Sequence, residues 1–272
     1  MAIDWLDESA INQSLISLPI PTHCVIMDSL PSTNQWLAEH ANHPSPLLVC
    51  ACEQQTQGKG RSGKHWHSRM AKDLTVSLRW EVPKQHQKET VTLSLMTAVV
   101  LAEWVNSLSP SRNCLLKWPN DLLIQDQKLA GILLEQINSR QVIIGIGVNV
   151  AAFDDTEHAH IQQPATSLEE IIHNKPNRTS LLTSLIAAIN EGLHRFQQDG
   201  FAPFYERWTR HDALLNQRII HTLGNKATIG IARGISEKGE LILELDDGTE
   251  QAIFSGTVRL FISSKLPNDG NE

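Results

Sequence analysis

Residues 90–108 (TVTLSLMTAVVLAEWVNSL) form a long apolar stretch that contains neither glycine nor proline. Its apolar residues recur with the period of an α-helix, which predicts one mostly buried helix. Such a helix requires a sizeable core around it. A composition of 41% hydrophobic and 19% charged residues can supply that core, with room for one large domain and a small one.

Strands and further helices are expected on both sides of this helix in the sequence. The Ser/Thr/Asn run at 32–34 contains residues that favour the N-cap of a helix. The stretch from 152 to 163 is polar and is expected to be flexible. We expect helices over 8–18, 36–40, 180–197 and 201–211, and strands over 24–27, 47–52, 74–80, 115–118, 122–125, 128–136 and 142–150. The strands at 122–125 and 128–136 are expected to form a hairpin.

The pattern changes near residue 216, where short alternating strands follow one another. They are expected over 218–222, 227–235, 240–245, 251–254 and 258–262, with Gly224, Gly239 and Gly248 marking turns. Five short strands suggest a small β-barrel appended to the larger domain. We therefore expect a large domain over 1–215 and a small one over 216–272.

Composition narrows the class of protein. No apolar run approaches the roughly 20 residues that span a bilayer, and the N-terminus lacks the pattern of a signal peptide. The four cysteines (Cys24, Cys50, Cys52 and Cys114) show no spacing typical of disulfides or zinc, and the pairs His65/His67 and His158/His160 lack a third ligand nearby. These features predict a cytoplasmic protein without a zinc site.

A basic, glycine-rich segment stands out against a net charge of −7. Residues 54–66 read QQTQGKGRSGKHW, in which glycines let backbone N–H groups approach an anion and cations can neutralise phosphate. Gly58 to Lys64 fits most of a P-loop, but His65 stands where that motif needs Ser or Thr, and a strand is expected to follow in place of a helix. A solvated basic loop is an equally good interpretation of this segment alone.

Two further segments place polar groups at the ends of expected strands. Residues 117–121 (KWPND) bring a cation, an amide and a carboxylate together, and Lys128 begins a strand in which Gly131 leaves room for a ligand. A solvent-facing hairpin lysine is the commoner fate of such a residue. Residues 145–149 (GIGVN) indicate close backbone approach and only weakly suggest a nucleotide site.

Together these segments resemble the biotin–protein ligase family, in their order and spacing, from about Ser32 to the C-terminal strands. The matching pieces are STN at 32–34, the glycine-rich run at 54–66, KWPND at 117–121, KLAGI at 128–132 and GIGVN at 145–149. The resemblance implies an α+β fold, with a mixed central sheet flanked by helices and a small C-terminal SH3-like β-barrel. It also implies an ATP-dependent ligase that forms biotinyl-5′-AMP and then transfers biotin to a lysine of a biotin carboxyl carrier protein, a subunit of acetyl-CoA carboxylase.

The resemblance also implies roles for individual residues. Lys128 and Arg61 are the expected catalytic residues, with Lys128 bridging the biotin carboxylate and the α-phosphate. Biotin is expected to contact Ser32, Thr33, Asn34, Gln55, Gly58, Lys59, Arg61, Trp66, Lys128, Gly131 and Gly145. ATP and its phosphates are expected to contact Arg61, Lys64, Asn120, Asp121, Lys128 and Asn149. Mg²⁺ is expected to arrive with ATP and to lie near Asn120 and Asp121, and no tightly bound cofactor is expected.

Two departures from the family pattern carry expectations of their own. Lys59 stands where the family usually has arginine; it keeps the charge but loses the planar guanidinium, so we expect leakier retention of the adenylate. Only about 20 residues precede the first expected ligase strand, so this chain is not expected to bind operator DNA as some family members do.

Other readings stay open at this point. A lipoate or octanoate ligase of the same fold is the nearest alternative, followed by a nucleic-acid-binding module and a P-loop NTPase. The nucleic-acid reading has the net charge of −7 and the shortage of aromatic residues against it. A homodimer formed through an edge strand is possible from the pattern, and no membrane partner is expected.

Overall fold

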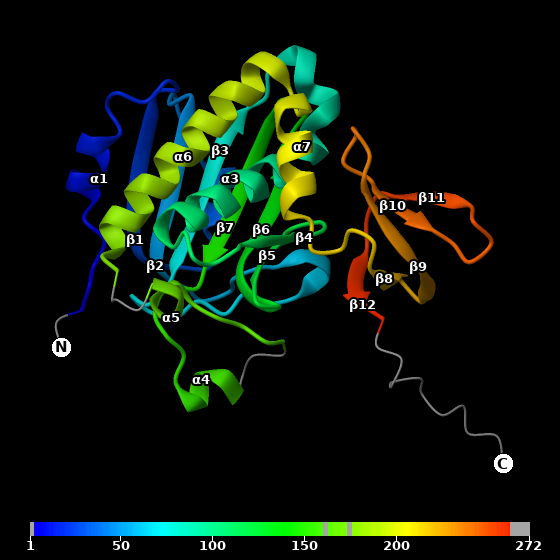
Figure 1. Ribbon diagram of the computed structural model, residues 1–272. Helices are drawn as coiled ribbons and strands as arrows, with labels where there is room; N and C mark the ends of the chain where they lie inside the picture. The colour runs from blue at the N-terminus through cyan, green and yellow to red at the C-terminus, as the bar shows by residue number, and fades with distance from the viewer. Residues whose placement is uncertain (1–2, 160–162, 173–175, 262–272) are drawn as a thin grey trace.

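The computed structural model describes residues 3–159, 163–172 and 176–261. Its larger part is a seven-stranded mixed sheet in the order β1-β2-β3-β7-β6-β5-β4 (Figure 1). Only the pair β1 and β2 is parallel among the strand pairs of this sheet in the described residues. The strands are β1 (Thr22–Leu30), β2 (Leu47–Gln55), β3 (Leu74–Glu81), β4 (Leu115–Lys117), β5 (Asp121–Ile124), β6 (Gln127–Gln136) and β7 (Gln141–Val148).

The two faces of this sheet differ because side chains alternate along each strand. On one face Val76, Ile144 and Ile146 join the main hydrophobic core. On the other face the register places Ser77 beside Gly145, and Gly131 beside Gly147. The second face is therefore hollow and partly polar at its centre, which leaves room for a cavity.

Helices cover the apolar face. These are α3 (Leu93–Leu108), α6 (Arg178–Asp199) and α7 (Ala202–His211), and they contact one another in front of the sheet (Figure 1). The 3₁₀ segment Lys84–Thr92 precedes α3, so the α-helix predicted from residue 90 begins at Leu93. By length and composition Lys84–Leu108 could cross a membrane, contrary to the sequence expectation, but 67% of its most apolar window is buried inside the fold. That burial is typical of a core helix.

The opposite face carries α2 (Thr33–Glu39), which contacts β2, β3 and β7. Ser32 is its N-cap, as predicted, and accepts a hydrogen bond from Gln35 N. The helix start therefore lies over the hollow face, and its first residues, Thr33 and Asn34, are buried there.

Both edges of the large sheet are covered. Helix α1 (Glu8–Ser14) lies against β1, where Glu8 Oε2 accepts from Ile26 N at 2.7 Å and Asn12 Oδ1 accepts from Cys24 N at 2.9 Å. At the other edge, Ala213 N donates to Leu116 O of β4 at 2.9 Å. These contacts satisfy polar groups that an edge strand would otherwise expose. A homodimer formed by edge pairing would have to displace them.

The C-terminal part is a five-stranded antiparallel sheet in the order β11-β10-β9-β8-β12. Its strands are β8 (Arg218–Leu223), β9 (Lys226–Ile235), β10 (Leu241–Glu244), β11 (Glu250–Ile253) and β12 (Thr257–Leu260). It lies beside the large sheet (Figure 1), and Trp118 Nε1 donates to Gly239 O at 3.0 Å across the junction. The predicted end of the last strand, Ile262, lies outside the described residues.

Several strand ends differ by one to three residues from the sequence expectations, and the larger differences concern short helices. Helix α1 ends at Ser14, four residues before the predicted end. The stretch predicted to be flexible contains α4 (Asp155–Ala159), and α5 (Leu168–Ile172) was not predicted. Residues 160–162 of that stretch lie outside the described chain. Each helix in this region is only five residues long, too short for a clear periodic signal.

Candidate active site

A cavity of about 920 Å³ opens on the hollow face of the large sheet. Its floor comes from β3, β6 and β7, and the glycine-rich segment and the KWPND segment form two walls. Gly256, Thr257 and Val258 reach its rim from the C-terminal sheet. This size suits a small molecule together with a nucleotide.

One end of the cavity is lined by buried polar side chains that bond to one another. Gln55 Oε1 accepts from Thr33 N at 2.7 Å and from Thr33 Oγ1 at 3.0 Å. Thr33 Oγ1 lies 2.6 Å from Ser77 Oγ, and Ser77 Oγ donates to Asn34 Oδ1 at 2.5 Å. Side chains fixed in this way present a preorganised set of donors and acceptors to a compact polar group.

Trp66 covers the middle of the cavity floor. A Cβ added to Gly147 would lie 2.3 Å from Trp66 Cε2, and one added to Gly131 would lie 3.5 Å from Trp66 Cζ3. The indole therefore lies directly over two glycines that face each other across β6 and β7. Its Nε1 is buried and has no hydrogen-bond partner among the described residues, so it can donate to a ligand.

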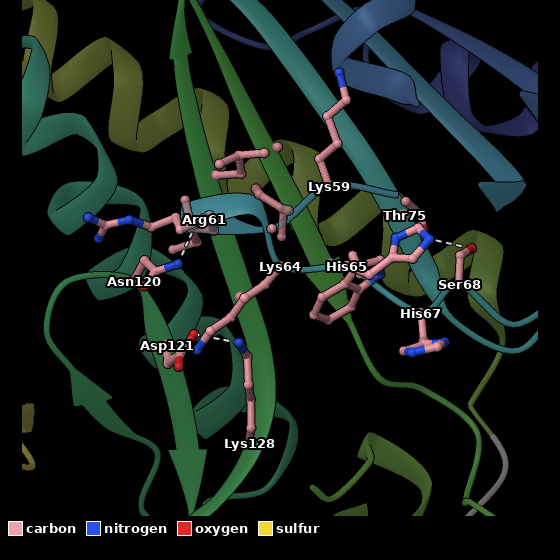
Figure 2. A pocket seen from close by; sticks show the side chains of 18 of the residues that line it. Lys59, Arg61, Lys64, His65, His67, Ser68, Thr75, Asn120, Asp121 and Lys128 are labelled. Carbon is pink, nitrogen blue, oxygen red and sulfur yellow. Dashed lines mark hydrogen bonds and ion pairs between the residues drawn. The ribbon is translucent and has the colours of Figure 1, made fainter. Parts of the chain in front are cut away.

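The glycine-rich segment folds back on itself above this floor. Gly60 N donates to Lys64 O at 2.8 Å, and Trp66 N donates to Gly58 O at 3.0 Å. Gly58 is buried against Trp66 and does not line the cavity. Figure 2 shows Lys64 pointing towards Asp121 and Lys128, whereas Lys59 points away from them.

Cations gather around Asp121. Lys128 Nζ lies 2.6 Å from Asp121 Oδ1 (Figure 2) and 5.9 Å from the centre of the Trp66 ring. Burial lowers the pKa of Lys117, Asp121 acts in the opposite direction, and the charges of Lys128 and Lys64 lower it further. Burial also lowers the pKa of the Arg61 guanidinium, against the attraction of Asp121. Lys128 thus pairs with Asp121, Lys117 and Arg61 lie within the reach of its charge, and Lys64 points towards it. This excess of positive charge suits phosphate.

Few side-chain atoms around Asp121 could coordinate a metal ion. No group of three or more His, Cys, Asp or Glu side chains that could hold one occurs in the described part of the chain. Asn120 Nδ2 donates to Ile132 O at 2.8 Å, which leaves Asn120 Oδ1 as an oxygen donor beside the Asp121 carboxylate. Two oxygen donors fit a Mg²⁺ ion that completes its coordination with nucleotide phosphates and water.

At the mouth of the cavity two basic residues have structural partners. Arg69 bonds Asp73 Oδ1 at 2.5 Å and Glu157 Oε2 at 3.1 Å, and its guanidinium lies 4.0 Å from the Phe153 ring centre. Lys72 Nζ lies 2.6 Å from Glu157 Oε1. Arg69 and Lys72 therefore hold the segment around 151–157 in place, and Arg69 also lines the cavity, as Arg61 and Lys64 do.

Most of the residues singled out from the sequence do meet in this cavity. Those that line it are Ser32, Thr33, Asn34, Gln55, Lys59, Arg61, Lys64, Trp66, Asn120, Asp121, Lys128, Gly131, Gly145 and Asn149; Gly58 does not. Asn149 Nδ2 donates to Lys128 O and Thr166 O, which fixes the backbone of Lys128. The space beside Gly131 holds Trp66 and the end of the Lys128 side chain.

Sequence reasoning missed several lining residues. Thr75 and Ser77 alternate with apolar residues along β3, and this period-two pattern could have identified them. Lys117, the cation of the KWPND segment, also lines the cavity, although its motif predicts no separate role for it. The rim residues Phe153, Glu157 and Gly256–Val258 come from distant segments and carry no local signal.

Two family models and several known proteins match the sequence of this chain. Residues 26–149 match the model of the biotin/lipoate A/B protein ligase family, and residues 214–260 match the biotin protein ligase C-terminal domain. The chain is 33% identical over 244 residues to the bifunctional ligase/repressor BirA of Escherichia coli, an alignment covering 88% of this chain and 74% of that protein. It is 30% identical to the biotin–[acetyl-CoA-carboxylase] ligase of Paracoccus denitrificans, covering 78% of this chain and 90% of that one.

A solved structure agrees with most of the fold. The biotin protein ligase of Aquifex aeolicus, in complex with biotin and ATP, superposes with a TM-score of 0.76 at 27% identity. The match covers 88% of this chain and 99% of the other. That protein is thus similar to this one in fold over most of the chain, as well as in sequence.

Proposed function

The chain belongs to the biotin protein ligase family, and from this we propose that it joins biotin to a lysine of a biotin carboxyl carrier protein of acetyl-CoA carboxylase, with ATP as the source of energy. The observation that carries the proposal is one cavity with a buried polar end at Thr33 and a cationic end at Lys128. A ligand with a neutral polar head and a carboxylate tail fits between these ends.

The first step that we propose is adenylation. A carboxylate oxygen of biotin attacks the α-phosphorus of ATP; the bond from that phosphorus to the bridging oxygen breaks, and pyrophosphate leaves with the electron pair. Two anions must approach each other, which fixed cations favour. Lys128 lies where it can contact both, and Arg61 and Lys64 line the same cavity.

The second step transfers the biotinyl group. The neutral ε-amine of the carrier lysine attacks the acyl carbon of biotinyl-5′-AMP, the bond to the phosphate oxygen breaks, AMP leaves with the electron pair, and the nitrogen loses one proton to water. Mg²⁺ neutralises phosphate charge when it is bound with ATP, and Asn120 and Asp121 would hold it. Trp66 lies at mid-cavity, where its ring can pack against the apolar valerate chain and keep water from the acyl group.

The proposed division of labour between domains follows from the same geometry. We assign adenylation to residues 1–215 and assign the smaller unit, 216–272, a contribution to the rim. The match of residues 214–260 to a separate family model supports this boundary. Contact of Gly256–Val258 with the cavity supports a role for the small unit in the reaction.

ATP–pyrophosphate exchange by the purified chain tests the proposal, with biotin, lipoate and octanoate compared as acyl substrates in the presence of Mg²⁺. Exchange that requires biotin is the expected result. Exchange with lipoate or octanoate would assign the chain to that activity instead. A second assay follows transfer of labelled biotin to a carrier protein, with a carrier lacking its acceptor lysine as the control.

A further inference from the structure

A chain of hydrogen bonds leads from the surface acid Glu135 to the polar end of the cavity. Asn34 Nδ2 donates to Glu135 Oε2 at 2.5 Å, and Asn34 Oδ1 accepts from Ser77 Oγ at 2.5 Å. Ser77 Oγ lies 2.6 Å from Thr33 Oγ1. Glu135 itself is on β6, on the same face as Gly131 and the cavity.

The carboxylate fixes the direction of every bond in this chain. A carboxylate only accepts hydrogen bonds, so the Asn34 amide must turn its NH₂ group towards Glu135 and its oxygen towards Ser77. An amide oxygen also only accepts, so the single hydroxyl proton of Ser77 is committed to Asn34. In the contact between Ser77 and Thr33, the donor must then be Thr33.

Thr33 therefore has no proton to offer a ligand. Its hydroxyl proton points into the protein, where Ser77 Oγ at 2.6 Å and Gln55 Oε1 at 3.0 Å both accept. The orientation of Gln55 is fixed independently, because its Oε1 also accepts from the backbone Thr33 N. What Thr33 Oγ1 presents to the cavity is a lone pair.

We propose that Glu135 is a positioning residue for substrate selection: through Asn34 and Ser77, and together with Gln55, it holds the Thr33 proton away from the ligand, so that the site favours an N–H group at this point of the ligand. The inference rests on the proposed function, since a cyclic urea such as the head of biotin carries N–H groups, whereas a cyclic carbamate has replaced one of them with oxygen. An oxygen there would face the Thr33 lone pair.

Burial helps to keep the hydrogen bonds between Thr33, Ser77 and Asn34 in one direction. Asn34 is 4% exposed, Thr33 2% and Ser77 0%, so little of their surface is open to water that could compete with the bonds of this chain. With a neutral amide at position 135, both orientations of Asn34 would be satisfied, because an amide can donate or accept. Ser77 could then donate to Thr33, which would leave the Thr33 proton only its longer contact with Gln55 Oε1 at 3.0 Å, so that this proton could turn towards the ligand.

The test is the selectivity of the Glu135→Gln variant. Biotin-dependent ATP–pyrophosphate exchange is measured with two competing inhibitors, the cyclic carbamates in which one or the other ureido N–H of biotin is replaced by oxygen. In the wild type, one of the two should inhibit at least about tenfold more weakly than the other, the scale of one mismatched hydrogen bond. In Glu135→Gln, the KM for biotin should rise several-fold and the difference between the carbamates should fall about tenfold.

Two further variants show whether the effect passes along the chain. Ser77→Ala removes the middle hydroxyl and should relax the selectivity in the same way; combined with Glu135→Gln it should add little further. Glu81→Gln is the matched control, since Glu81 ends β3, which is separated from β6 by β7, and its side chain is 57% exposed. It should leave the selectivity and both KM values unchanged.

The alternative outcomes are distinct. Unchanged carbamate selectivity in Glu135→Gln would overturn the positioning role while leaving the ligase activity established by the wild type. An equal rise in the KM for ATP and for biotin would indicate general loss of structure and also overturn it. A wild type without biotin-dependent exchange would overturn the proposed function, and this inference with it.

Discussion

Lys128 and Asp121 form an ion pair across the neighbouring strands β6 and β5, with 2.6 Å between Lys128 Nζ and Asp121 Oδ1. Both side chains are about one-fifth exposed, at 19% and 20%. The pair keeps the ammonium at a defined position beside Trp66 before any ligand arrives. An anionic ligand that reaches Lys128 therefore shares a cation that is already in place, so less reorganisation is needed during reaction.

Replacement of Lys128 by alanine should abolish adenylation and leave the fold intact. The side chain lies at the cavity wall, so its loss removes charge stabilisation without opening the core. We expect biotin-dependent ATP–pyrophosphate exchange to fall by a factor of about 10² or more. The melting temperature, measured by circular dichroism, should change by only a few degrees.

The exposed Lys226 of β9 offers a matched control for the same change of charge. Lys226→Ala should retain wild-type exchange. Biotinylation at the wild-type rate by Lys128→Ala would remove Lys128 from the mechanism.

Lys117 should lower the stability of the ligand-free protein while helping it to bind phosphate. Burial and the nearby Lys128 and Lys64 lower its pKa in the fold, so between the folded and unfolded pKa values the unfolded chain binds more protons and stability rises with pH. Below the folded pKa the charged lysine costs stability. Lys117→Met should therefore raise the melting temperature near neutral pH and raise the KM for ATP.

The pH dependence separates this effect from simple packing. As the pH rises above the unfolded pKa of lysine, the wild-type residue becomes neutral in both states and the difference in melting temperature between wild type and Lys117→Met should shrink. A stabilisation that stays constant at alkaline pH would mean that packing, not charge, is responsible.

The sequence predicted the elements of the large sheet well because each has a strong local pattern. β2 reads as a continuous apolar run, and α3 as a long apolar helix. Local patterns do not give the order of the strands in the sheet. In the structure β7 lies between β3 and β6, and the pairing of β7 with β6 places Gly131 beside Gly147 beneath Trp66. The short helices α4 and α5 lack enough residues to show a period.

The candidate site could be predicted where chemistry is concentrated in a short motif. The glycine-rich run and the KWPND segment each contain charged residues and residues that favour turns. The structure brings Arg61, Lys64 and Asp121 of these segments into one cavity. The chain from Glu135 to Thr33 spans β6, α2 and β3, so no single segment contains it. Its existence depends on the register of the sheet, which only the fold supplies.

Gly147→Ala should displace Trp66. The new Cβ would lie 2.3 Å from the indole, and the backbone of the strand fixes the direction of this Cβ, so the indole has to move. We expect a loss of about 1–3 kcal/mol in the free energy of unfolding, typical of overpacking. The KM for biotin should rise, and tryptophan fluorescence should report the change of environment.

A double variant assigns this effect to the indole. With Trp66→Ala the collision disappears, so Gly147→Ala should then cost little stability, although biotin would still bind weakly without the ring. Equal costs in the two backgrounds would show that the strain lies in the backbone of β7 and not in contact with Trp66.

Lys59→Arg should slow the escape of biotinyl-5′-AMP from the cavity. Lys59 is exposed and points away from the Lys64, Asp121 and Lys128 group (Figure 2), on a segment whose own hydrogen bonds hold it above Trp66. A guanidinium offers a planar set of donors where the ammonium offers a point charge, so it can tie this segment to the ligand more firmly when the cavity is filled. Release of labelled adenylate into an excess of unlabelled biotin and ATP measures the effect, with Lys226→Arg as the control. We expect release several-fold slower than in the wild type; a wild type that already retains the adenylate longer than Lys59→Arg would show that lysine is no weakness at this position.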